Sequence, residues 1–212
     1  MLSIAVFVSG SGTNLQALID YEKSHTSCPY RIRLVVSDRK DAYALERAKK
    51  AGVATELVSA YAVLGKEKAE AASRDEKRLA VSNAALAACK KHKADAILLA
   101  GWLTVLCGPI IGEYGGKIIN LHPALLPKFG GVGMWGRRVH EAVIAEGEKE
   151  SGCTVHFVDS GCDTGAILVQ KKVSVMPGDT ADTLYARIAP VEHDAIVEGA
   201  CLLAERLSGS AD

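Results

Sequence analysis

The sequence lacks the features that mark a membrane, secreted or polyanion-binding protein. No apolar run among its 212 residues reaches bilayer-spanning length. Residues 1–4 include no basic segment, and no long apolar segment follows them, so we expect no signal peptide and no membrane association. Lys and Arg number 25, as do Asp and Glu, so the formal net charge is zero. Nucleic acid is therefore not an expected partner, and an anionic ligand needs a local binding device.

The six cysteines show no metal-binding pattern. They stand at positions 28, 89, 107, 153, 162 and 201, without a C-x-x-C pair or another ligand spacing. Several lie in apolar runs, and small buried hydrophobic residues of a reducing cytoplasm are their expected role. The sequence thus predicts a cytoplasmic protein without a metal.

The order of apolar segments predicts the fold. Strands are expected at 4–8, 32–37, 55–58, 96–100, 117–121, 154–158 and 167–173, and helices at 14–21, 42–51, 77–92 and 182–207, the last interrupted at Pro190. Residues 62–75 are expected to be an exposed helix or a mobile loop. Continuous apolar runs are typical of buried parallel strands. Alternating strands and helices predict one α/β domain over residues 1–212, a Rossmann-like, open, mostly parallel twisted sheet with helices on both faces.

A glycine-rich loop, Ser9-Gly-Ser-Gly-Thr-Asn14, follows the first strand and opens a helix. Its glycines allow close approach of an anion, and the start of the helix supplies free N–H groups. The loop is neither a Walker A motif nor the dinucleotide G-x-G-x-x-G, because Leu15 stands at the last position. A phosphate cradle and an ordinary βα turn capped by Thr13 or Asn14 both fit this pattern.

Residues 118–127 run from an apolar strand into a segment held by two prolines. Asn120 and His122 are two positions apart, so in an extended chain their side chains point the same way. The amide donates to a carbonyl oxygen that becomes negative, and the imidazole donates to it or moves a proton. Ligands of open α/β sheets bind at the carboxyl ends of strands, where this segment lies. A purely structural histidine is the alternative.

A second polar segment, residues 159–165, separates the last two predicted strands. Asp163 in this segment would orient His122 and raise its pKa, or relay a proton through water. The alternative for Asp163 is a turn residue before Gly165.

Three segments together resemble the phosphoribosylglycinamide formyltransferases, also called glycinamide ribonucleotide transformylases. They are residues 9–16, residues 120–127, and residues 152–158 leading to Asp163-Thr-Gly. Their order and spacing match from about residue 3 to the helix after Glu192. The resemblance implies a formyltransferase fold and a transferase of purine biosynthesis. It would move a formyl group from its co-substrate 10-formyltetrahydrofolate to the amine of glycinamide ribonucleotide, without a metal or a covalent enzyme intermediate.

The resemblance implies a role for each matching residue. Asn120 and His122 would stabilise the oxyanion of the tetrahedral intermediate, and Asp163 would support His122 and assist proton transfer. The ribonucleotide would contact Gly10, Ser11, Gly12, Thr13, Asn14 and Glu192. The folate would contact Arg78, Leu103, Thr104, Val105, Leu106, Asn120, Asp159, Ser160, Gly161, Cys162 and Asp163. Residues 1–100 would bind the ribonucleotide phosphate and 101–212 would bind folate and carry catalysis, in a monomer or homodimer. Without the resemblance, Glu192 and Arg78 read as solvated helix charges.

Two departures from the family pattern stand out. Residues 129–140 are longer by several residues than the commoner Tyr-Pro-Gly turn and His-rich loop, and their glycines predict a mobile flap. Trp135 would cover a substrate or be anchored elsewhere. Arg137 or Arg138 would replace a phosphate contact or be the solvated start of a helix. Thr104 stands where many relatives carry Arg.

Three alternative functions follow from related chemistry. A 10-formyltetrahydrofolate hydrolase shares the Asn, His and Asp group but usually has an extra N-terminal domain, whereas this chain begins on its first strand. Methionyl-tRNA formyltransferase normally adds an RNA-binding domain, and zero net charge disfavours tRNA. A non-catalytic nucleotide- or folate-binding protein would not need Asn120, His122 and Asp163.

Overall fold

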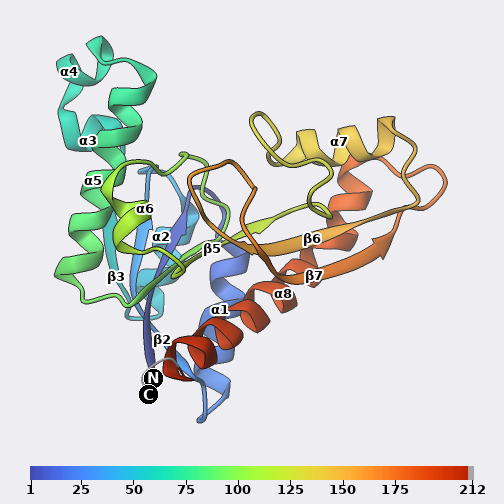
Figure 1. Cartoon of the computed structure of the whole chain (residues 1–212), viewed down its shortest axis with the longest axis horizontal. Coiled ribbons are helices and arrows are strands. Elements are labelled where there is room, and N and C mark those ends of the chain that lie inside the picture. Colours follow the sequence, from blue (N-terminus) through green and yellow to red (C-terminus); the bar gives the residue numbers. More distant parts are fainter. Residues whose placement is uncertain (210–212) are drawn as a thin grey trace.

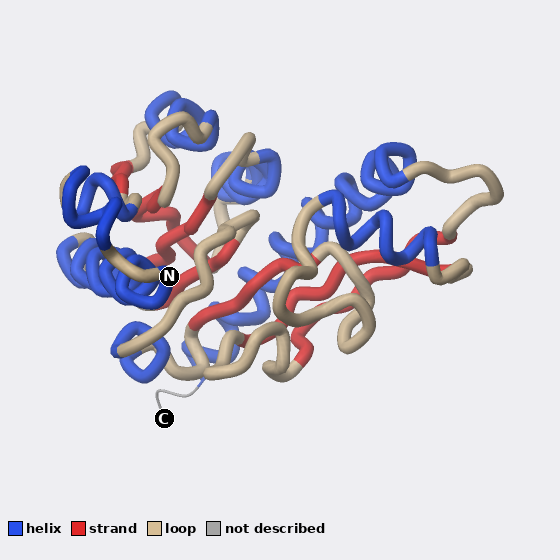
Figure 2. Tube along the Cα trace, turned by 90° about the horizontal axis from the view of Figure 1, so that it is seen from above, coloured by secondary structure: helices blue, strands red, loops and turns tan. Residues whose placement is uncertain are grey.

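The computed structural model describes residues 1–209, which form a mixed sheet covered by helices on both faces (Figures 1 and 2). Residues 210–212 of the predicted domain lie outside the described residues. The strands are β1 (Leu2–Val8), β2 (Tyr30–Ser37), β3 (Ala54–Leu57), β4 (Ala96–Leu99), β5 (Ile118–His122), β6 (Glu150–Phe157) and β7 (Ile167–Ser174). Their order in the sheet is β3-β2-β1-β4-β5-β6-β7.

Strands β1 to β5 run parallel, whereas β6 is antiparallel to β5 and β7 is antiparallel to β6. The connection between β6 and β7 is too short for a crossover helix, so these strands pair as neighbours in opposite directions. The predicted mostly parallel α/β sheet is confirmed. As a consequence, β1, β4 and β5 end at the same edge of the sheet.

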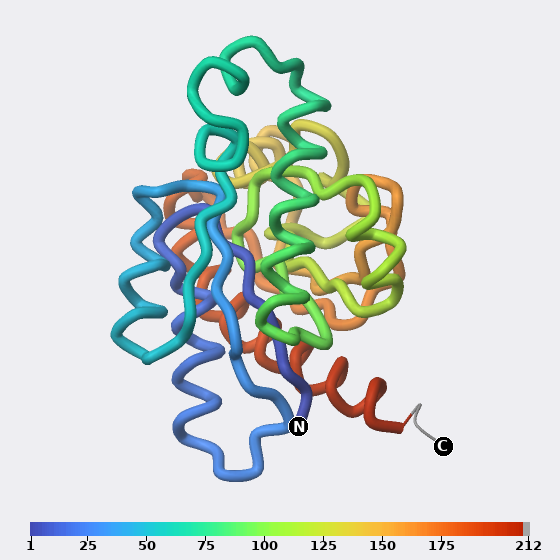
Figure 3. Tube along the Cα trace, turned by 90° about the vertical axis from the view of Figure 1, so that its left-hand side faces the viewer, coloured from blue at the N-terminus to red at the C-terminus, as the bar shows by residue number. Residues whose placement is uncertain are grey.

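The helices are α1 (Thr13–Ser24), α2 (Tyr43–Lys50), α3 (Ala60–Leu64), α4 (Lys66–Ala71), α5 (Arg74–Lys91), α6 (Pro109–Glu113), α7 (Arg137–Ala145) and α8 (Ala181–Gly209). Helices α1, α2 and α8 share one buried hydrophobic cluster, and α5 and α6 share another. Helices α3 and α4 extend beyond the sheet at the top of Figure 3. None of the helices in residues 1–209 is long and apolar enough to cross a bilayer.

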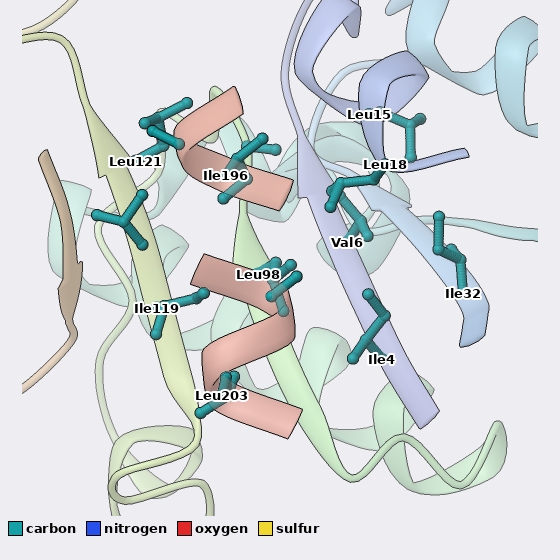
Figure 4. Close-up of a cluster of buried hydrophobic side chains, with 14 of the residues drawn as sticks. Ile4, Val6, Leu15, Leu18, Ile32, Leu98, Ile119, Leu121, Ile196 and Leu203 are labelled. Carbon is teal, nitrogen blue, oxygen red and sulfur yellow. The ribbon is translucent and has the colours of Figure 1, made fainter. Parts of the chain in front are cut away.

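Alternating side chains of β1 join the two layers of the core. Ile4 and Val6 belong to the cluster beneath α8, and Phe7 belongs to the opposite cluster, as the two-residue period of a strand requires. In Figure 4, Ile196 and Leu203 of α8 lie beside the side chains of β5. The first strand is therefore buried on both faces, which explains its unbroken apolar run.

Two sequence expectations need correction or completion. The break predicted at Pro190 is wrong, because α8 continues through it. The proline forfeits one helical hydrogen bond, but buried residues on both sides, including Ile188 and Ile196, hold the helix against the sheet. The ambiguous segment 62–75 is mostly helical and contains the end of α3, all of α4 and the start of α5. Ser59 caps α3, and Ser73 forms a capping box with Glu76 at the start of α5.

Candidate functional site

A cavity of about 860 Å³ opens at the carboxyl ends of β1, β4 and β5. Its wall consists of the loops after these strands, the segment 131–138, the loop after β6 and part of α8. Every residue predicted for the site lines this cavity except Ser160, which is exposed on the loop after β6. Side chains distributed over the sequence from Gly10 to Glu192 thus meet in one place.

The glycine-rich loop is held from behind by α2. The carbonyl oxygen of Gly10 accepts from the backbone N–H of Ala44 at 3.1 Å, and that of Ser11 accepts from Arg47 Nε at 2.9 Å. Gly12 has φ 73, and a Cβ added there would lie 2.5 Å from Ala44 Cβ. Glycine is therefore required at position 12 both by its conformation and by its closeness to α2.

Helix α1 begins after Gly12 without a side-chain cap. The expected cap from Thr13 or Asn14 is absent, so the ordinary capped turn considered from the sequence is not what forms here. N–H groups in the first turn of a helix have no helical partner. With its carbonyls turned to α2 and its helix start lining the cavity, the loop is suited to an anion.

The side chain of Asn14 faces α8. Its Nδ2 donates to Glu192 Oε2 at 3.3 Å, while its Oδ1 is buried and has no partner among the described residues. Glu192 is 6% exposed, so the sequence-based alternative of a solvated helix charge is wrong. Burial raises the pKa of Glu192, and the hydrogen bond from Asn14 offsets this only in part. The carboxyl group of Glu192 and the unpaired Oδ1 of Asn14 thus belong to two neighbouring residues of the cavity wall.

Asn120 and His122 stand on β5, where the strand enters the cavity. His122 is 3% exposed. Its Nε2 donates to the carbonyl oxygen of Phe129 at 2.8 Å, and its Nδ1 lies 3.5 Å from Asp163 Oδ2. Asp163 has φ 58, and its Oδ2 also accepts from the N–H of Gly131 at 2.9 Å. The histidine is therefore held between a carbonyl and a carboxylate.

The electrostatics of this pair differ from expectation. Burial lowers the pKa of His122, and the charge of Asp163, which acts in the opposite direction, does not compensate. The predicted upward effect of Asp163 on the His122 pKa is present, but burial, whose depth the sequence did not reveal, outweighs it. Burial pushes the Asp163 pKa upward, but the neighbouring His156, the charge of His122 and the backbone N–H of Gly131 outweigh it and lower the pKa. Burial thus favours the neutral imidazole, whose proton lies on Nε2. Nδ1 then turns a lone pair toward the ionised Asp163 carboxylate, so the two form a hydrogen bond only when the ring takes up a second proton.

His156 lies in the matching segment 152–158, but no sequence pattern assigned it to the site. It lies on β6 opposite Asn120 in the antiparallel pairing and lines the cavity. Its Nε2 lies 3.0 Å from Asn120 Nδ2 and 3.5 Å from Asp163 Oδ1. His156 reaches Asn120 because β6 pairs with β5 in the antiparallel direction. No short-range sequence signal specifies that direction.

The loop after β4 contributes apolar side chains to the cavity wall. Leu103 and Val105 are 42% and 41% exposed in the loop after β4, whose start is fixed by a hydrogen bond from Leu103 N to Ser9 Oγ at 2.9 Å. The hydroxyl of Thr104 donates to Asp38 Oδ2 at 2.6 Å. Exposed leucine and valine side chains beside backbone polar groups suit a flat aromatic ligand.

Two arginines of α5 also line the cavity. Arg78 lines the cavity, and its Nη1 lies 3.5 Å from Asp75 Oδ1. Arg74, one helical turn earlier, also lines the cavity and was not predicted for the site. The signal in the sequence was its spacing of four positions from Arg78, which places both side chains on one face of a helix. Two guanidinium groups at the cavity wall can receive a carboxylate.

The glycine-rich segment 130–136 forms another wall, with positive φ at three of its glycines. The guanidinium of Arg138 lies 5.1 Å from the ring centre of Trp135, which is half exposed. Arg137 pairs with Glu141 and Asp182. Arg137 therefore has acidic partners of its own, and its expected alternative role as a solvated helix residue fits the structure better than a phosphate contact.

Comparison with known proteins gives consistent similarities. Residues 2–199 match the family model described as formyl transferase. Phosphoribosylglycinamide formyltransferase of Escherichia coli is 34% identical over 91% of this chain and 82% of its own length. The crystal structure of glycinamide ribonucleotide transformylase 1 from Symbiobacterium toebii superposes with a TM-score of 0.84 at 38% identity, covering 97% of this chain and 88% of that chain.

A larger protein is also similar. Trifunctional purine biosynthetic protein adenosine-3 of Drosophila pseudoobscura is 40% identical over 95% of this chain, which spans 14% of the length of that protein. The similarity therefore concerns one part of a much longer polypeptide.

Proposed function

This chain belongs to the formyl transferase family, and on that premise we propose that it transfers the formyl group of 10-formyltetrahydrofolate to the amine of glycinamide ribonucleotide, a step of purine biosynthesis. The observation that carries the proposal is the common cavity. The cavity is lined by the start of α1, by Asn120, His122 and Asp163, by the loop 103–106 and by Arg74 and Arg78.

The cavity accounts for both substrates. The phosphate of the ribonucleotide would bind the start of α1, with Glu192 and Asn14 beside the rest of that substrate. The pterin of the folate would lie against the loop 103–106, and its carboxylates would face Arg74 and Arg78. The amine and the formyl group would then meet at the end of β5. We accordingly assign the phosphate site to the first half of the chain, residues 1–100, and the folate and catalytic sites mainly to residues 101–212.

Residues that line the cavity can supply each group that the proposed reaction needs. The amine nitrogen attacks the formyl carbon, and the carbonyl oxygen becomes an oxyanion. The amide of Asn120 would donate to this oxygen, and donors that are already in place lower the barrier most. The imidazole of His122 would add its own stabilisation when Nδ1 is protonated as well, because its Nε2–H is bound to Phe129. Asp163 would hold His122 and pass the amine proton through water toward N10 of the folate, whose bond to the formyl carbon then breaks.

The state of the cysteines supports a proposal for the compartment. All six cysteines are free, and three of them, Cys28, Cys89 and Cys153, are buried. Free thiols fit a reducing compartment, and we propose that the enzyme works in the cytoplasm.

The proposal is tested by following the absorbance of the deformylated folate from a 10-formyl folate analogue, with and without glycinamide ribonucleotide. Product that forms only with the ribonucleotide supports the transferase. Product that forms equally without it would identify a hydrolase, and no product in either reaction would contradict a folate-dependent transfer.

A further inference from the structure

The imidazole of His156 is enclosed between the backbone and two residues of the proposed catalytic group. It is 2% exposed. Its Nδ1 lies 2.9 Å from the carbonyl oxygen of Phe157, and its Nε2 lies 3.0 Å from Asn120 Nδ2. The same Nε2 lies 3.5 Å from Asp163 Oδ1. None of these contacts was assigned a function above.

These contacts define one proton arrangement. A carbonyl oxygen only accepts hydrogen bonds, so Nδ1 must carry the proton that it donates to Phe157. In the neutral ring Nε2 then has a lone pair and accepts from the amide nitrogen of Asn120. If the amide of Asn120 were reversed, its oxygen would face that lone pair, and the contact would become repulsive unless the buried ring took up a second proton.

We propose that His156 is a positioning residue that fixes the rotation of the Asn120 amide for formyl transfer, a role that rests on the function proposed above. One N–H of Asn120 is bonded to His156, which leaves the second N–H for the formyl oxygen. Without His156 the amide would be free to rotate by half a turn and present its own oxygen to the developing negative charge. An acceptor in that place would repel the oxyanion rather than stabilise it.

Asp163 has hydrogen-bonding partners other than His156. The Asp163 carboxylate pairs poorly with an unprotonated Nε2, but it accepts from Gly131 N at 2.9 Å and faces His122. His156 can therefore accept the hydrogen bond from Asn120 while Asp163 pairs with His122. The pair His156 and Asn120 and the pair Asp163 and His122 thus have separate roles although they lie close together.

A double-mutant cycle tests the proposal. We expect His156→Leu to lower kcat about 10- to 100-fold, the range that misplacement of a catalytic group produces, with both KM values nearly unchanged. In the Asn120→Ala background the same substitution should cost little more, because no amide remains to be oriented. His156→Gln, whose side-chain oxygen can accept from Asn120, should recover part of kcat. Equal losses from His156→Leu in both backgrounds would overturn the proposal.

A second readout does not depend on turnover. In the wild-type protein, ¹⁵N NMR of the histidine rings should show the Nδ1–H tautomer for His156, and its Nε2 resonance should move in Asn120→Ala. A proton on Nε2 at neutral pH, or a resonance that ignores Asn120→Ala, would overturn the positioning role. If the wild type formylates no ribonucleotide, the proposed function fails, and the NMR result still decides whether His156 orients Asn120.

Discussion

Asn14 Nδ2 donates to Glu192 Oε2 at 3.3 Å, and this bond joins the first helix of the chain to the last across 178 positions of sequence. It closes the wall of the cavity where the ribonucleotide is proposed to bind. The bond also leaves a carboxyl group buried at 6% exposure, which is costly unless the group serves a ligand.

Glu192→Gln should therefore separate stability from binding. Burial raises the Glu192 pKa, so at neutral pH the folded state pays for an ionised carboxylate that the unfolded state carries freely. Removing the charge should raise the thermal midpoint of unfolding. It should also raise the KM for the ribonucleotide roughly tenfold, the loss of one charged hydrogen bond, and leave the KM for folate unchanged.

The matched control for this prediction is Glu198→Gln. Glu198 lies on the same helix but is exposed and paired with Lys171, so its substitution should alter neither KM. A Glu192→Gln variant that is less stable and binds the ribonucleotide normally would contradict the assigned role.

The glycine-rich loop gives a second prediction. Gly12→Ala should weaken ribonucleotide binding far more than folate binding, because the added Cβ would meet Ala44 and push the loop away from α2. Gly52→Ala is the control, since Gly52 has φ 76 but open space around its Cβ position. Calorimetric titration of both variants measures the two affinities. Equal losses for both ligands in Gly12→Ala would indicate general misfolding instead.

Asn120→Ala should abolish most turnover and spare binding. The amide is proposed to donate to an oxygen that is negative only during the reaction, so kcat should fall roughly 100- to 1,000-fold. Ribonucleotide affinity should stay nearly constant in titration calorimetry. Asn83→Ala, on the exposed side of α5, should leave both unchanged. If ribonucleotide binding disappeared together with turnover, the assigned role of Asn120 would be wrong.

Stability should decline in mildly acidic solution. Burial lowers the pKa of His122, and burial together with the charge of His122 lowers the pKa of His140. Below the ordinary histidine pKa of about 6.5, these two histidines are therefore protonated in the unfolded chain but remain neutral in the folded chain. In a Glu192→Gln background, which removes the opposing protonation of the buried carboxyl, the free energy of unfolding should fall as the pH drops through this value.

Urea denaturation on either side of that pH measures the effect. His140→Gln should flatten the decline, and it breaks no hydrogen bond at Nδ1, which has no partner among the described residues. A free energy of unfolding that is constant across this range, or that rises toward acid, would contradict the burial argument.

Local sequence signals predicted much of the fold. The apolar runs predicted the strands of a mostly parallel sheet, because strands buried on both faces need no polar alternation. The residues Asn120 and His122 could be paired from their spacing alone. In each case the information lies within a few neighbouring residues.

Features that depend on tertiary contacts were not predictable. Pro190 lies within α8 because buried residues on both sides outweigh one lost hydrogen bond. His156 reaches Asn120 only through the antiparallel pairing of β6. The downward shift of the His122 pKa depends on burial, and the pairing of Arg137 with Asp182 depends on how α7 packs against α8. No spacing rule contains such information.

The most direct test of the account follows the formyl group itself. The enzyme would be incubated with glycinamide ribonucleotide and 10-formyltetrahydrofolate that carries ¹³C in the formyl group, and the products would be identified by mass spectrometry and NMR. The account predicts the label in an amide on the ribonucleotide amine, and loss of that product in Asn120→Ala. Label found in free formate, with the ribonucleotide unchanged, would contradict it.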